Sequence, residues 1–155
     1  MPTQLSPNFT LDELLVTSYK EFQQKQLEEV KPFMNNLYIL ANYILQPIRN
    51  YYKSPIIINS GFRGESLNKK VGGTATSDHT CIKGAAAADF TVKGKTVDEV
   101  FKDIISGKIG IYYRQVILEK HSWIHIASFR LPFNKDDKYL DKLTTEDGKI
   151  YKKII

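Results

Sequence analysis

Two histidines and an aspartate in the middle of the chain are residue types that could hold a metal ion. His79 and Asp89 flank a stretch rich in glycine and alanine, and His125 follows in the segment Trp123-Ile124-His125. Together they would supply two imidazoles and one carboxylate. A catalytic zinc ion uses three such protein ligands and leaves a fourth position open for water. We therefore expect a catalytic Zn²⁺ site at His79, Asp89 and His125.

Other residues near these positions offer alternatives. Asp78 would replace Asp89 as the carboxylate ligand if Asp89 points away. His121 lies four residues before His125, a spacing that suits two metal ligands on one helix, but the apolar residues around Trp123 favour a strand and leave His121 on the surface. Cys81 has no accompanying histidine and asparagine in a recognisable arrangement, so we interpret it as a buried small residue or a loop thiol.

Helices and strands must bring these residues together. The predicted helices are 11–17 and 96–106, each opened by a capping box, the main helix 27–52, and a short helix 66–71. Pro47 should kink or interrupt the main helix. The predicted strands are 56–60, a β-branched run typical of a buried strand, then 85–92, 114–119 and 123–129. Alanine favours helix in 85–92 by propensity, but Gly84 and the Phe90-Thr91-Val92 end favour a strand.

A predicted hairpin identifies a candidate general base. The strands 114–119 and 123–129 are separated by three residues, which predicts a tight turn. If Glu119 lies opposite Trp123, then Ile117 lies opposite His125. Because side chains alternate between the two faces of a strand, Gln115, Glu119 and His125 would then share one face. Glu119 is thus our candidate for the catalytic acid and base.

Composition indicates one ordinary soluble domain over residues 1–155, with a core from about 5 to 130 and a charged extension over 131–155. The chain has 155 residues, 42% of them hydrophobic and 25% charged, which is average for a globular protein. The net charge of +5 is modest, and no recognition-helix or aromatic-platform signature supports nucleic-acid binding. No apolar run approaches the length of a membrane span. A single cysteine rules out an internal disulfide.

Several ordered segments resemble a known family. They are Ile58-Asn59-Ser60-Gly61-Phe62-Arg63, Leu67-Asn68, Val71-Gly72-Gly73, Ser77-Asp78-His79 and the late Trp123-Ile124-His125. The chain resembles, over roughly residues 5–128, the zinc D-alanyl-D-alanine carboxypeptidases and related peptidoglycan peptidases, including phage endolysins. That family carries S-G-Y-R, then S-x-H-x-x-G-x-A-x-D, then W-x-H. In the family the aspartate follows the histidine by seven positions, whereas here the two are ten apart, which implies an insertion near 80–83.

The resemblance implies an α+β fold of the hedgehog/DD-peptidase type: a small antiparallel sheet with helices packed on one side and a zinc site on the open face. It implies hydrolysis of peptidoglycan stem peptides or cross-links, with Arg63 as the family arginine that binds a substrate carboxylate or the developing oxyanion. Many relatives place an acid three residues before the last histidine, where this chain has Ser122. Ser77 and Gln115 could hydrogen-bond the ligands or the substrate.

Two further expectations concern the setting and a rival function. The first residues have neither the basic nor the apolar region of a signal peptide, so we expect synthesis in the cytoplasm, action on the cell wall after release or delivery, and a monomer without nucleic-acid or membrane partners. The alternative is a catalytically inactive zinc-containing module that binds cell wall or serves a structural role in a phage. Ser122 and the insertion after His79 favour it.

Overall fold

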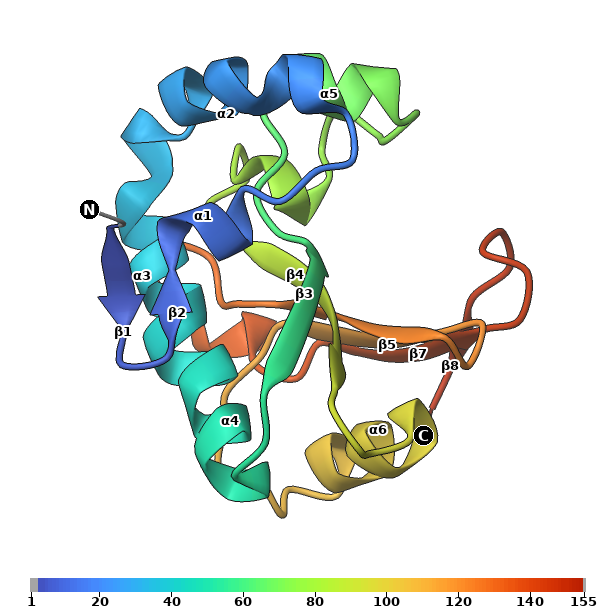
Figure 1. Ribbon diagram of the computed structural model, residues 1–155. Coiled ribbons are helices and arrows are strands. Elements are labelled where there is room, and N and C mark those ends of the chain that lie inside the picture. The colour runs from blue at the N-terminus through green and yellow to red at the C-terminus, as the bar shows by residue number, and fades with distance from the viewer. Residues whose placement is uncertain (1–2, 155) are drawn as a thin grey trace.

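The computed structural model describes residues 3–154 and contains two sheets (Figure 1). A small antiparallel sheet pairs β1 (Gln4–Ser6) with β2 (Phe9–Thr10). The main sheet has six strands in the order β3-β4-β6-β5-β7-β8. Its strands are β3 (Ile56–Ser60), β4 (Ala87–Val92), β5 (Gln115–Glu119), β6 (Trp123–Ala127), β7 (Asp141–Thr145) and β8 (Lys152–Lys153).

The α+β class is as expected and a small antiparallel sheet is present, but most strands belong to a second sheet. The main sheet is larger and mixed, because β7 pairs with β5 in parallel while every other neighbouring pair is antiparallel. The end of β6 lies opposite the start of β5, and after the segment 128–140 strand β7 also begins beside Gln115. The chain therefore enters β7 in the same direction as β5.

The α-helices follow the predicted order with different boundaries. They are α1 (Leu11–Leu14), α2 (Gln23–Glu29), α3 (Met34–Leu40), α4 (Gln46–Tyr52), α5 (Glu65–Lys70) and α6 (Val97–Ile105). Short 3₁₀ turns are η1 (Lys20–Phe22), η2 (Lys31–Phe33), η4 (Asp78–Thr80) and η5 (Lys135–Asp137). The Thr10–Glu13 capping box is present, but α1 ends at Leu14 rather than near 17. Thr96 caps α6 by accepting from the backbone N–H of Glu99.

The predicted main helix is divided at two prolines. The turn η2 contains Pro32 and separates α2 from α3. Before Pro47 the chain adopts a π-helical segment, η3 (Ala41–Leu45), which connects α3 to α4 without a break. Proline has no backbone N–H for an α-helical hydrogen bond, and a wider π turn accommodates that loss. Pro47 therefore changes the helix geometry rather than ending the helix.

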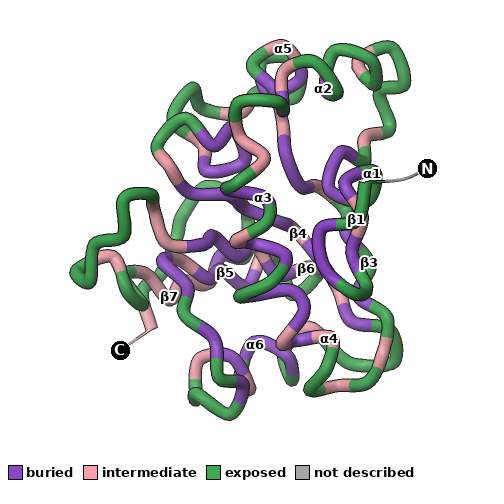
Figure 2. Tube along the Cα trace, turned by 90° about the vertical axis from the view of Figure 1, so that its left-hand side faces the viewer, coloured by how far each residue is buried: buried purple, intermediate pink, exposed green. Residues whose placement is uncertain are grey.

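One face of the main sheet forms the core and the other is left for the site. Val116 and Leu118 of β5, Ile124 and Ile126 of β6, and Phe90 of β4 are buried in one apolar cluster with residues of α3, α4 and α6. Figure 1 shows α4 and α6 below the sheet and α2 and α5 above it, and Figure 2 shows the buried strands between exposed helix surfaces. The expectation of helices on one side thus holds for α3, α4 and α6.

The predicted hairpin is confirmed in its register. Glu119 pairs with Trp123 and Ile117 pairs with His125. Lys120 and His121 both have a φ of 53°, the left-handed conformation that closes the turn. Strand β3 has the predicted bounds, but it is an edge strand with Ile57 half exposed rather than a fully buried strand.

The residues after 130 do more than extend over the surface. Strand β7 lies beside β5 in the main sheet, and Thr145 at its end is buried. The Asp147-Gly148 turn then leads back to β8. Among residues 3–154, no helix is long and apolar enough to cross a bilayer.

Candidate metal centre

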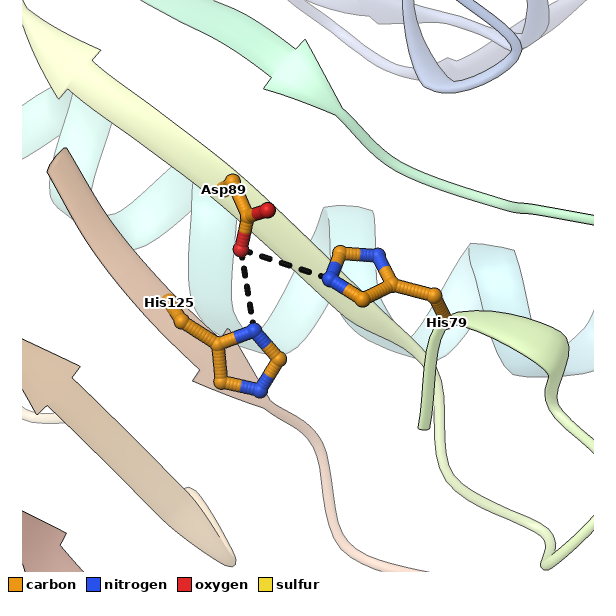
Figure 3. Close-up of side chains that lie close together, drawn as sticks. All are labelled: His79, Asp89 and His125. Carbon is orange, nitrogen blue, oxygen red and sulfur yellow. Dashed lines mark hydrogen bonds and ion pairs between the residues drawn. The ribbon is translucent and has the colours of Figure 1, made fainter. Parts of the chain in front are cut away.

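Three separate elements deliver His79, Asp89 and His125 to one point (Figure 3). Asp89 on β4 and His125 on β6 are direct partners in the strand pairing, and His79 comes from η4. Asp89 Oδ1 lies 2.9 Å from His125 Nδ1 and 3.3 Å from His79 Nε2. One ligand atom from each residue lies within 4.8 Å of the other two. The sequence-predicted ligands therefore form a single cluster.

The segment Gly61–Arg63 holds His79 from two sides. His79 Nδ1 lies 2.6 Å from the Gly61 carbonyl oxygen, and the Arg63 backbone N–H donates to the His79 carbonyl at 2.9 Å. Because a carbonyl only accepts, the ring proton must be on Nδ1. The Nε2 atom of a neutral His79 then carries a free lone pair, and this atom faces Asp89.

The protonation states suit a cation between these atoms. Burial lowers the pKa of His79, although the Asp89 carboxylate opposes that effect. Burial alone would raise the pKa of Asp89, but the two imidazoles outweigh it and hold that pKa below its ordinary range. A neutral imidazole and an ionised carboxylate thus direct lone pairs at one another. Neutral histidine and carboxylate are the forms that bind metals, so this donor set fits a zinc ion.

Asp78, the alternative carboxylate ligand, is engaged elsewhere. It forms a buried ion pair with Arg114, and the two side chains are each 7% exposed. The extra residues between His79 and Asp89 form a turn in which the Gly84 N–H donates to the Cys81 carbonyl at 3.0 Å. Ile82 at this turn is exposed. The structure therefore absorbs the insertion at the surface and brings Asp89, not Asp78, beside the imidazoles.

A model of the family described as peptidase M15 matches residues 7–127. The chain belongs to the peptidase M15 family. Members of this family are zinc-dependent metallopeptidases, so membership implies a peptide substrate. The His-Asp-His cluster agrees with a zinc-dependent enzyme. No curated protein and no solved structure matches the chain significantly.

The cluster of this M15 peptidase lies in a cleft of about 600 Å³. Glu119 and Arg63 both line it, as do the three cluster residues. Glu119 is half-buried, and burial raises the pKa of its carboxyl group, an effect that nearby His125 opposes and Asp89 reinforces. Burial lowers the pKa of Arg63, and Asp89 acts in the opposite direction. Both predicted catalytic side chains therefore line the same cleft as the cluster, and the charge of Asp89 affects the pKa of each.

The two expected supporting residues differ in what they contact. The Ser77 hydroxyl accepts from the His79 backbone N–H at 3.3 Å and from Arg63 Nη2 at 3.4 Å. Gln115 also lines the cleft, but its side-chain amide donates to Asp141 on β7 at 3.3 Å. Ser77 thus positions two of the predicted site residues, whereas Gln115 connects the site strand to β7.

Two other sequence interpretations concern residues outside the cluster. His121 lies at the hairpin tip, half exposed, and its ring nitrogens lie 2.8 Å from Asp98 and 3.1 Å from Glu146. Cys81 is buried, and burial raises the pKa of its thiol to about 12. Since the thiolate is the reactive and metal-binding form, Cys81 stays a packed, protonated thiol.

Sequence reasoning missed several residues that line the cleft: Lys83, Arg114, Arg130 and Tyr151. Tyr151 comes from the C-terminal segment, where burial and the charge of Glu119 raise the pKa of its hydroxyl. The Asp147-Gly148 dipeptide was an available signal, because such a pair between two extended runs is a strong hairpin indication. The three cations carry no comparable local signal.

Proposed function

We propose that this M15 peptidase hydrolyses peptide bonds of peptidoglycan, in stem peptides or cross-links, with His79, Asp89 and His125 as its zinc ligands. It would act as a D-Ala-D-Ala carboxypeptidase or as an endopeptidase of the endolysin type. The observation that carries the proposal is the Nε2 atom of His79 facing the Asp89 carboxylate at 3.3 Å, since a metal ion would satisfy both groups.

The side chains of the cleft suit the steps of peptide hydrolysis. Zinc, when bound, polarises a carbonyl and lowers the pKa of water. Glu119 would accept the proton of the attacking water and then give it to the leaving amine, and its raised pKa suits a group that must do both. The Arg63 guanidinium would stabilise the negative charge that develops on the scissile carbonyl oxygen.

The rival function is an inactive zinc-containing module that binds cell wall. The position of the missing acid, Ser122, lies at the exposed hairpin tip, where its hydroxyl donates to the Lys120 carbonyl. Glu119 on the neighbouring strand supplies a carboxylate within the cleft itself. The hydrolase is therefore the function that the cleft supports better. We also propose that the protein reaches the wall after release from the cell or by delivery from outside.

Substitution of Glu119 tests the proposal directly. Zinc-loaded wild type, Glu119→Gln and the control Glu28→Gln, an exposed acid on α2, would be incubated with purified peptidoglycan and the products measured by mass spectrometry. We expect Glu119→Gln to keep its zinc and to lose about 10²–10⁴-fold in rate, while Glu28→Gln cleaves like wild type. Release of single D-Ala residues would identify a carboxypeptidase, and released fragments an endopeptidase.

The same digest can contradict the proposal. A Glu119→Gln variant that cleaves as fast as wild type would remove Glu119 from the mechanism. A wild-type protein that holds zinc and binds peptidoglycan without cleaving it would establish the binding module.

A further inference from the structure

One end of the cleft is basic, and the reaction proposed above does not use it. Lys83, Arg114 and Arg130 line this end. Asp78 neutralises Arg114. Within the part of the chain that the structure describes, Lys83 and Arg130 have no acidic partner within 4.0 Å. Two positive charges at this end are therefore left without compensation.

Buried donors at the basic end also lack partners. The Nε atoms of Arg114 and Arg130 are buried, and no hydrogen-bond acceptor for either is found among residues 3–154. A buried donor without an acceptor costs free energy. Guanidinium groups pair well with carboxylates, often through two hydrogen bonds. Because the side chains of both arginines line the cleft, their guanidinium groups are placed to meet a ligand that carries a carboxylate.

Strand register places the basic end on one side of the metal cluster and Glu119 on the other. Ile117 of β5 pairs with His125, which pairs with Asp89, so these three form the central row. Gln115, next to Arg114, lies two residues before that row and Glu119 two residues after it. At about 3.3 Å per residue, each lies about 7 Å from the centre. A substrate could thus react at the cluster while its carboxylate lies at the basic end.

Two segments that lie far apart in the sequence build the basic end. Lys83 belongs to the insertion after His79, and Arg130 lies beyond the residues that match the family, 7–127. The Leu131 backbone N–H donates to the Gly84 carbonyl at 2.9 Å, which holds the two segments side by side. A Cβ atom on Gly84 would lie 2.6 Å from the Leu131 carbonyl oxygen, so this close approach needs glycine. The two cations are therefore brought together by a defined backbone contact.

We infer that Lys83, Arg130 and Arg114 form a subsite for a substrate carboxylate one or two residues from the bond that is cut. This inference rests on the proposed function and names the substrate class: an anionic peptide. The carboxylate could be the free C-terminus of the stem peptide or the second carboxylate of a diamino acid such as diaminopimelate. Both present the same group to the arginines, and experiment can distinguish them.

Binding without turnover provides the test. The zinc-loaded Glu119→Gln chain would be titrated by calorimetry with three synthetic peptides: L-Ala-γ-D-Glu-L-Lys-D-Ala-D-Ala, its C-terminal amide, and the free acid with meso-diaminopimelate in place of lysine. The same titrations would be done after adding Lys83→Gln and Arg130→Gln. The matched control adds Lys25→Gln and Lys102→Gln, two exposed lysines outside the cleft, and removes the same charge.

We expect at least a tenfold preference within one of the two peptide pairs, and that pair identifies the carboxylate. Adding Lys83→Gln and Arg130→Gln should reduce the preference below threefold and leave the affinity for the less favoured peptide unchanged, whereas the control keeps the preference. The subsite is overturned if no peptide binds, if neither pair shows a preference, or if the preference survives the loss of both cations. The proposed function fails separately, if wild type neither holds zinc nor cleaves peptidoglycan.

Discussion

At the scale of single residues, the two aspartates beside His79 have different tasks. Asp89 faces both imidazoles, at 2.9 and 3.3 Å, while Asp78 is bound to Arg114 in a buried ion pair. Asp78 therefore stabilises the scaffold, whereas the next residue, His79, belongs with Asp89 to the metal site. The account requires that the two carboxylates respond differently to removal of their charge.

We predict that Asp78→Asn destabilises the protein without removing the metal. Loss of the charge leaves the Arg114 guanidinium buried and unpaired, which costs about 3–5 kcal/mol of unfolding free energy. Denaturant titration measures this loss, and metal analysis of the folded variant should still find zinc. Asp89→Asn should lose the zinc. A folded Asp78→Asn protein that cannot bind zinc would contradict the assignment of the two residues.

The buried state of His79 predicts a pH effect on the metal-free protein. Burial lowers the pKa of His79, so the unfolded chain binds a proton more readily than the folded one. The resulting stability is present above the ordinary histidine pKa of about 6.5 and is lost as pH falls below it. Between pH 7.5 and 5.5, metal-free wild type should lose more unfolding free energy than metal-free His79→Gln. Equal losses in the two proteins would show that His79 is not held in its neutral form.

At the scale of elements, the turn from β3 to α5 fixes the position of η4. Gly61 accepts the His79 ring proton with its carbonyl, and the N–H of the next residue, Phe62, donates to the Leu14 carbonyl at 2.7 Å. A Cβ atom on Gly61 would lie 2.4 Å from the Leu14 carbonyl oxygen. This approach of one backbone to another explains the glycine of the Ser60-Gly61-Phe62-Arg63 segment.

We predict that Gly61→Ala weakens both the fold and the metal site. The clash is with backbone, which must shift, and such overpacking costs about 1–3 kcal/mol. The shift also displaces the acceptor of the His79 ring proton, so the affinity for zinc should fall. Gly110→Ala is the matched control because nothing lies within 4 Å of its added Cβ. Thermal unfolding measures the stability of both variants, and zinc titration measures their affinity for the metal. A Gly61→Ala protein as stable as the control would refute the packing argument.

The elements also show what the sequence can predict. Strand alternation was enough to place Glu119 and His125 on one face, because a short hairpin fixes the register locally. Capping residues located the starts of α1 and α6. The parallel pairing of β7 with β5 was not predictable, since its partner lies far away in the sequence and its residues are mostly half-buried. The cations at the basic end were missed because a backbone contact between distant segments brings them into the cleft.

At the scale of the whole molecule, the metal cluster joins the turn η4 to two neighbouring strands of the main sheet. Its residues lie on η4, β4 and β6, and the contacts of Gly61 and Arg63 with His79 also hold η4 against the segment that follows β3. Asp89 contacts both imidazoles, and the two rings also pack edge to face with their centroids 5.0 Å apart. A metal bound at all three residues would therefore stabilise the folded chain as a whole.

We predict that a chelator lowers the unfolding temperature of the zinc-loaded protein. A ligand present at 100 times its dissociation constant stabilises the fold by about 2.7 kcal/mol. At about 2–4 °C per kcal/mol for a domain of this size, the unfolding temperature should shift by about 5–11 °C. Scanning calorimetry with and without EDTA measures the shift. The His125→Ala variant should show no shift, and an equal shift in that variant would place the stabilising metal elsewhere.

The most direct test of the central claim is the zinc content of the purified protein beside His79→Ala and His125→Ala, with peptidoglycan cleavage measured on the same samples. The account predicts about one zinc ion per chain in the wild type, together with product release, and loss of both in each variant. A wild-type protein without zinc, or variants that keep both zinc and activity, would contradict it.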